Sequence, residues 1–292
     1  MLTIKAKLLR FVSRQFLYTK DGGDVKTLQV QGENGPIRVL KYLPPKPGKH
    51  PVHVNLHGGG YVVGVADWDN FWCRRVADET GAVVFNIDYA KAPENPFPAA
   101  LYQVRDLIAS LSEDPDLDLS RLSIGGFSAG GGLACAYILY CIQNNLPVPQ
   151  LCLPTYVYIN ASTPYSEALA AVPEETRQKA VPAFAMDIFR QSYTTDYDNI
   201  LVSPLFAPDE LLAKFPRTVI LNAEWDALHL DGDKFADRLR ENGVDVVHHL
   251  YEGVTHGWTH IREGEQYYNG KVREESFDLM IQEIKKFHET SS

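Results

Sequence analysis

The chain has 292 residues, 45% of them hydrophobic, and its 28 basic and 37 acidic side chains give a net charge of −9. This length and hydrophobic content suffice for one large domain with a buried core. An acidic chain without a basic run is poorly suited to nucleic acids and other anionic polymers, which excludes them as partners. No apolar run reaches the roughly 18 residues that a transmembrane helix needs, so none is predicted.

The first 20 residues carry basic side chains and no acidic one. A basic, amphipathic start is typical of a mitochondrial transit peptide, but also of a structural helix. We favour the structural helix, because charges interrupt the apolar stripe and no cleavage site is recognisable, and we therefore expect a cytoplasmic protein. The residues expected on one face of this helix are Leu8, Phe11, Val12 and Phe16.

The cysteines lack the C-x-x-C spacing of zinc sites, and their spacing indicates no disulfide framework. We expect them to be buried, reduced thiols, and we expect neither a metal nor a cofactor. The four residues are Cys73, Cys135, Cys141 and Cys152.

Apolar periodicity and turn residues predict strands and helices in alternation. The run at 82–88 is apolar throughout, as expected for a central parallel strand buried on both faces. Up to residue 144 we expect a strand hairpin at 25–43, strands at 51–57, 82–88 and 121–126, and helices at 70–80, at 98–111 and from Ser128 to about Asn144.

Residues 160–216 contain no obvious strand but several prolines and tyrosines, and we interpret them as an inserted, mostly helical cap with one helix near 183–193. The alternation of strands and helices predicts an α/β fold, with a mostly parallel sheet covered by helices on both faces in a single domain. The remaining elements expected are strands at 151–159, 219–224 and 244–251 and helices at 231–242 and 274–288.

The stretch Gly126-Phe127-Ser128-Ala129-Gly130 reads G-x-S-x-G and lies between an apolar strand and a helix. This context is that of a nucleophile elbow. Ser128 would lie at the tip of a strained turn, and glycines would be needed at 126 and 130 because strand and helix pass close together. The helix would direct its positive N-terminal end at the serine, where negative charge develops during acyl transfer.

A second motif, His57-Gly58-Gly59-Gly60, follows the strand at 51–57. Loops of this kind supply the backbone N–H groups of an oxyanion hole, because glycine lets amides turn toward a ligand. We expect Gly58, Gly59 and Gly60 to form this hole together with the amide of Ala129. His57 is expected to support the loop by hydrogen bonding rather than to act as a base.

Asp226 follows an apolar strand, at the carboxyl edge where sites form in α/β sheets. Glu224, two residues earlier, is the alternative, because catalytic triads accept either acid. Asp226 is favoured because it lies further into the loop.

His256 lies on the loop after the last expected strand. The alternatives are His248, His249 and His260. His248 and His249 lie inside a strand and cannot both face a site at its end, and His260 lies beyond the turn. His256 is therefore the expected base, and the order serine, acid, histidine is that of α/β-hydrolases.

The chain resembles the hormone-sensitive lipase-like group of α/β-hydrolases, which includes small carboxylesterases and arylacetamide deacetylase-like enzymes. The resemblance covers nearly the whole chain. It implies ester hydrolysis by Ser128, Asp226 and His256, and a cap built from residues 1–20 and 160–216. The motifs that carry it are 57–60, 88–94 (similar to D-Y-x-L-A-P-E), 126–130, 224–226 and 256–258.

Two residues depart from the family pattern: Phe127 stands where Asp is common, and Lys91 replaces an apolar residue. Neither touches the triad, but both leave the subfamily and the substrate open. The aromatic side chains considered for an apolar substrate pocket, each with core packing as its alternative, are Tyr61, Phe127, Trp258, Tyr165 and Tyr193.

The expected function is hydrolysis of a small to medium apolar ester through an acyl-enzyme. Hydrolysis of a lactone or an amide, or transfer to an acceptor other than water, would use the same triad and remains an alternative. A non-catalytic ligand-binding receptor is a further alternative, which the complete triad argues against. The expected partner is a small-molecule ester, and the sequence leaves open whether the protein is a homodimer.

Overall fold

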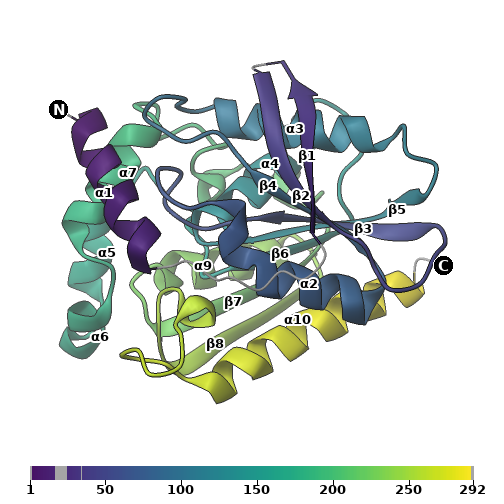
Figure 1. The fold of residues 1–292 in the computed structure, drawn as a ribbon. Helices are drawn as coiled ribbons and strands as arrows, with labels where there is room; N and C mark the ends of the chain where they lie inside the picture. The colour runs from purple at the N-terminus through teal and green to yellow at the C-terminus, as the bar shows by residue number, and fades with distance from the viewer. Residues whose placement is uncertain (1, 17–24, 34, 291–292) are drawn as a thin grey trace.

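The computed structural model of the protein describes residues 2–16, 25–33 and 35–290. Within these residues an eight-stranded sheet has the strand order β1-β2-β4-β3-β5-β6-β7-β8 (Figure 1). Strand β2 pairs antiparallel with β1 and β4, and all the other pairs are parallel. The strands are β1 (Val25–Gly32), β2 (Gly35–Tyr42), β3 (His50–Leu56), β4 (Val83–Asp88), β5 (Leu117–Phe127), β6 (Leu151–Thr155), β7 (Arg217–Trp225) and β8 (Val246–Thr255).

Helices cover both faces of the sheet, which confirms the predicted α/β architecture (Figure 1). Helices α2 and α10 lie together on one face, and α3 and α4 lie together on the other. The helices are α1 (Leu2–Phe16), α2 (Asn70–Thr80), α3 (Ala99–Leu111), α4 (Ala129–Gln143), α5 (Tyr165–Ala171), α6 (Glu174–Lys179), α7 (Ala183–Tyr193), α8 (Asp209–Leu212), α9 (His229–Glu241) and α10 (Gly270–Thr290).

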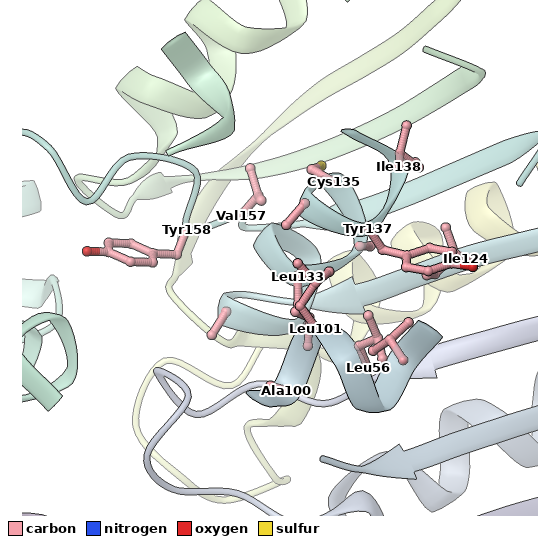
Figure 2. Packing of buried hydrophobic residues seen from close by; sticks show 14 of the residues in the cluster. Leu56, Ala100, Leu101, Ile124, Leu133, Cys135, Tyr137, Ile138, Val157 and Tyr158 are labelled. Carbon is pink, nitrogen blue, oxygen red and sulfur yellow. The ribbon is translucent and has the colours of Figure 1, made fainter. Parts of the chain in front are cut away.

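Side chains alternate between the two faces of the strands, so the sheet contributes to two separate cores. On one face, Leu56 and Ile124 pack with Leu101 of α3 and Leu133 of α4 (Figure 2). Helix α4 is buried almost all round, which makes it the central helix of this layer. The core on the opposite face includes Leu40, Leu153, Leu221, Trp72 and Phe277.

The strand expected at 151–159 is shorter in the structure and ends at Thr155. The chain turns at Tyr156, whose φ of 37° is left-handed and incompatible with a continuing strand. The amide of Tyr158 then donates to the carbonyl of Ser128 at 3.2 Å instead of to a neighbouring strand. The apolar run continues to Ile159 because these residues are buried beside the end of the sheet, not because they belong to it.

The cysteines and the insert at 160–216 follow the expectation in outline. All four thiols are buried and free. The insert contributes no strand to the sheet within the described residues, but it holds four helices, α5 to α8, where one was expected. Short helices of this kind carry too few residues for apolar periodicity to reveal them.

The N-terminal residues form helix α1, which lies beside α7 (Figure 1). It is anchored by buried Ala6 and by Arg10, whose guanidinium donates to the carbonyl of Val62 at 2.6 Å. Leu8 and Phe11, expected to share a face, are 63% and 64% exposed. This face therefore points to solvent, whereas residues 17–20 of the expected helix and the side chains of Val12 and Phe16 lie outside the described part. Among the helices of residues 2–16, 25–33 and 35–290, none combines the length and the hydrophobicity that a membrane span requires.

Substitution of Leu133 tests how much the stability of the fold depends on packing around α4. Leu133→Ala should lower the free energy of unfolding by about 2–5 kcal/mol, because it removes a fully buried side chain and leaves a cavity. Urea unfolding followed by circular dichroism measures the change. Leu146→Ala, at a position that is 39% exposed, is the control and should cost far less. Equal losses for the two variants would contradict this assignment of the core.

Candidate active site

Ser128 occupies the sharp turn between the end of β5 and the start of α4. Its φ of 54° is left-handed, as the elbow interpretation requires. A Cβ atom at Gly130 would lie 2.0 Å from the carbonyl oxygen of Leu56, and one at Gly126 would lie 2.4 Å from the same oxygen. Glycine is therefore obligatory at both positions, and the turn holds Ser128 at the N-terminus of α4.

The structure brings Ser128, His256 and Asp226 together. His256 Nε2 lies 2.9 Å from Ser128 Oγ, and His256 Nδ1 lies 2.6 Å from Asp226 Oδ2. A carboxylate accepts hydrogen bonds, so Nδ1 carries the proton and Nε2 is left to accept from the serine hydroxyl. Asp226 is buried, and its other oxygen accepts the N–H of Leu228 at 3.1 Å. The imidazole is thus held in the tautomer that a base for Ser128 needs.

The alternative acid and bases are engaged elsewhere. Glu224 accepts the amide of Gly253 at 2.8 Å and braces the end of β7 against β8. His248 binds Asp233 at 2.8 Å, and the ring of His249 packs on Tyr251 at 4.1 Å. His260 lies near the serine, but its Nε2 binds Asp69 at 2.9 Å. Among the described contacts, none of these side chains reaches Ser128.

The glycine loop lies directly beside the serine. A Cβ at Gly58 would be 3.7 Å from that of Ser128. The carbonyl of Gly59 accepts the amides of Val62 and Val63 at 3.0 and 2.9 Å, so the loop is a tight turn. Across the described residues, the amides of Gly59 and Gly60 and that of Ala129 donate no hydrogen bond. Amides without an acceptor beside the serine are what an oxyanion hole requires, and the assignment of this loop to that role stays a prediction.

His57 lies behind the loop and does not face the serine. It is fully buried, its Nδ1 donates to the carbonyl of Gly58 at 2.6 Å, and its ring stacks on Tyr89 at 4.2 Å. Burial, assisted by the charge of Lys91, lowers the pKa of His57 to about 4, so the ring is neutral at pH 7. These contacts fit the supporting role expected from the sequence.

Lys91, one of the two departures from the family pattern, belongs to an ion-pair network behind His57. Its ammonium group donates to Asp88 at 2.9 Å and lies 4.3 Å above the ring of Tyr89. Arg38 also donates to Asp88, at 3.2 Å. The lysine therefore replaces an apolar residue without leaving a buried charge unpaired.

A cavity of about 280 Å³ opens at Ser128 and His256. Of the aromatic residues expected in its wall, only Phe127 lies there. Tyr61 is buried and stacks on Tyr193 at 3.7 Å, and Trp258 is buried in the core beside α10. The other aromatic and aliphatic side chains in the wall are those of Val63, Trp68, Tyr156, Tyr158, Val181, Met186, Phe189 and Ile261.

Part of this wall could have been found from the sequence. Met186 and Phe189 are three residues apart on the helix expected near 183–193, so they share one face. Phe189 packs closely on the glycine loop, because a Cβ at Gly60 would lie 2.3 Å from its ring. Tyr156 and Tyr158 were not recognised because a strand was predicted through residue 159.

No group of three or more His, Cys, Asp or Glu side chains in the described chain is arranged to hold a metal.

This arrangement is that of an α/β-hydrolase: a serine on a strained turn after β5, with an acid after β7 and a histidine after β8. A sequence profile of the alpha/beta hydrolase fold matches residues 53–260, and the chain belongs to this family. The resemblance to hormone-sensitive lipase-like carboxylesterases predicted from the motifs is thereby confirmed, and the chain is a carboxylesterase-type hydrolase.

Several of the similar proteins are esterases. An esterase of Fusarium pseudograminearum is 30% identical over 82% of this chain and 76% of its own length. An ethyl acetate hydrolase of Pseudomonas putida is 31% identical over 69% of this chain and 64% of its own length. Among solved structures, an esterase of Pyrobaculum calidifontis aligns with a TM-score of 0.84 and 26% identity, covering 99% of this chain and 94% of that one.

Asp226 and Glu224 can be distinguished by substitution. Asp226→Asn should lower kcat for a p-nitrophenyl ester by about 10³–10⁴-fold, because an amide no longer holds His256 in the required tautomer. Glu224→Gln is the matched control and should keep kcat within a few fold. A larger loss for Glu224→Gln than for Asp226→Asn would mean that the acid has been assigned wrongly.

Proposed function

We propose that Ser128, His256 and Asp226 are the catalytic triad of this carboxylesterase, and that it hydrolyses small, uncharged, apolar esters through an acyl-enzyme. The observation that carries the proposal is the continuous pair of contacts from Ser128 Oγ to His256 at 2.9 Å and from His256 to Asp226 at 2.6 Å. The esterase relatives support the same reaction class.

In the first step, Ser128 Oγ attacks the acyl carbon of the ester while its proton passes to His256 Nε2. Asp226 stabilises the imidazolium that forms. The acyl oxygen becomes an oxyanion, which the amides of the Gly58–Gly60 loop and of Ala129 would bind. Each such donor is worth about 10²–10³-fold in rate, and the strained turn keeps the attacking oxygen next to them.

In the second step, His256 returns its proton to the alcohol oxygen as the ester bond breaks, leaving an acyl group on Ser128. Water then enters the site, loses a proton to His256 and attacks the acyl carbon. Collapse of the second oxyanion releases the carboxylic acid and restores the serine hydroxyl. The same three side chains and the same amides serve both steps.

The cavity supports a small, apolar substrate. Its volume of about 280 Å³ lies near the lower end of the roughly 300–1,000 Å³ of ligand pockets. Its wall is mostly aromatic and aliphatic, and within the described residues it contains the carboxylates Asp69 and Glu265 but no lysine or arginine. A negatively charged acid portion would therefore be bound poorly.

We also propose that α1 and the insert at 160–216 act as a cap that sets the size of this cavity. Met186 and Phe189 of α7 form part of the cavity wall, and α1 packs against α7. The substrate would thus lie between two surfaces. The proposed catalytic groups at the edge of the sheet would contact it on one side, and the inserted helices would contact it on the other.

Ser128→Ala tests the proposed nucleophile. Turnover of p-nitrophenyl acetate should fall by about 10⁶-fold, to background, because no other hydroxyl replaces Oγ. A fluorophosphonate probe should label the wild-type protein once, at Ser128, and should not label the variant. Circular dichroism checks that the variant is folded. Wild-type-like turnover by the folded variant would refute the proposal.

A second test concerns the role of α7 in the cavity wall. Met186→Ala should move the preferred acyl chain of a p-nitrophenyl ester series to greater length, because it removes buried side-chain volume from the wall. Phe184→Ala, on the outer face of the same helix where the side chain is 64% exposed, is the control and should leave the preference unchanged. An unchanged preference in both variants would contradict the assignment of α7 to the substrate site.

A further inference from the structure

A second pair of carboxylate and imidazole lines the cavity beside the proposed triad. Asp69 is buried at the end of the short turn before α2, and its Oδ1 lies 2.9 Å from His260 Nε2. Its other oxygen accepts the side-chain amide of Asn55 at 2.6 Å, and Asn55 also donates to Asn86 at 3.0 Å. One oxygen of Asp69 is thus fixed by His260, and the other by Asn55 of β3, which is itself bonded to Asn86 of β4.

The contacts of His260 determine what it can do. Because the carboxylate of Asp69 accepts a hydrogen bond, Nε2 of His260 carries the proton of the neutral ring. Nδ1 is then a hydrogen-bond acceptor. The hydroxyls of Tyr156 and Thr259 lie 3.0 and 2.9 Å from Nδ1. Both nitrogens are therefore occupied, so His260 is not available as a second base. What it can do is hold the hydroxyl of Tyr156 in place.

Tyr156 in turn contacts the proposed base. Its ring meets the ring of His256 edge-on, with centroids 4.9 Å apart and an angle of 65°. Tyr156 is buried and keeps a left-handed φ of 37°, a strained conformation for a residue other than glycine. Such a conformation persists only where surrounding contacts enforce it. Here the amide of Tyr156 donates to the carbonyl of Leu221 at 2.6 Å, and the hydroxyl at the far end of the side chain is held by His260 and Thr259.

The contact between His260 and Asp69 also holds the loop that carries His256. His260 ends the single helical turn Trp258–His260 that follows His256 and Gly257. Its contact with Asp69 therefore anchors the loop four residues after the base. Asp226 and Ser128 contact the two nitrogens of His256, and the ring of Tyr156 packs edge-on against the side of the imidazole.

We propose that Asp69, His260 and Tyr156 form a positioning array that holds the ring of His256 in line with Ser128. The proposal rests on the function proposed above for His256. It also accounts for Phe127, which departs from the family pattern as Lys91 does. The ring of Phe127 meets that of His260 at 4.8 Å and 81° and packs on Tyr156 at 5.7 Å. An apolar ring fills this space, where an Asp would add a second carboxylate near Asp69.

Tyr156→Phe is the central test, because it keeps the ring and removes only the hydroxyl that His260 holds. We expect kcat for p-nitrophenyl acetate to fall about tenfold with KM unchanged, since misalignment of a base slows the chemical step rather than binding. His260→Ala should lower kcat at least as much. His260→Gln should restore kcat to within about threefold of wild type, because its amide can donate to Asp69 and accept from Tyr156.

His248→Ala is the matched control. It removes a histidine whose Nε2 binds a carboxylate, Asp233, at 2.8 Å, but which contacts neither His256 nor Tyr156. This variant should keep the wild-type kcat. Thermal unfolding of every variant separates loss of stability from loss of alignment, and Tyr156→Phe gives an answer even if His260→Ala fails to fold.

Three results would overturn the array: a wild-type kcat for Tyr156→Phe, a loss that appears in KM alone, or an equal loss of kcat in His248→Ala. Failure of the array is distinguishable from failure of the proposed function. If Ser128→Ala is inactive while Tyr156→Phe is unaffected, only the array is wrong. If Ser128→Ala keeps its turnover, the proposed triad itself is wrong.

Discussion

The site depends on one close contact, the passage of the first turn of α4 over the end of β3. The carbonyl oxygen of Leu56 leaves no room for a side chain at Gly126 or Gly130, so α4 can begin only where both residues are glycine. This contact fixes Ser128 at the helix N-terminus. Because the loop of glycines begins two residues after Leu56, the same contact places the free amides next to the serine.

The parallel sheet supplies the rest of the site. Strands β5, β6, β7 and β8 are neighbours in this order and run in the same direction, so their carboxyl ends lie along one edge. Asp226 follows β7 and His256 follows β8, which brings an imidazole within 2.9 Å of a serine 128 residues earlier in the chain. No local preference encodes this contact; it follows from the strand order.

The sequence was sufficient to predict the fold and to bring Ser128, Asp226 and His256 together as candidates, because each of these residues lies in a short motif at the end of a strand. It was not sufficient for the cavity wall. Tyr61 and Trp258 follow two of these motifs directly, which suggested that they face the site, but the turns direct both into the core. Conversely, Tyr156 lies in an apolar run that reads as strand, and only its left-handed backbone brings its ring to His256.

His256 and His260 show most clearly what sequence alone cannot decide. The two are four residues apart on one loop, each binds a buried carboxylate, and both line the cavity. The partner of His256 lies 30 residues away on the adjacent strand end, where the fold class predicts an acid. The partner of His260, Asp69, lies 191 residues away. What separates the two histidines is their second nitrogen, which faces the serine in His256 and the hydroxyls of Tyr156 and Thr259 in His260. The division that we propose between a base and a supporting histidine is therefore a property of the packed loop, not of the residue type.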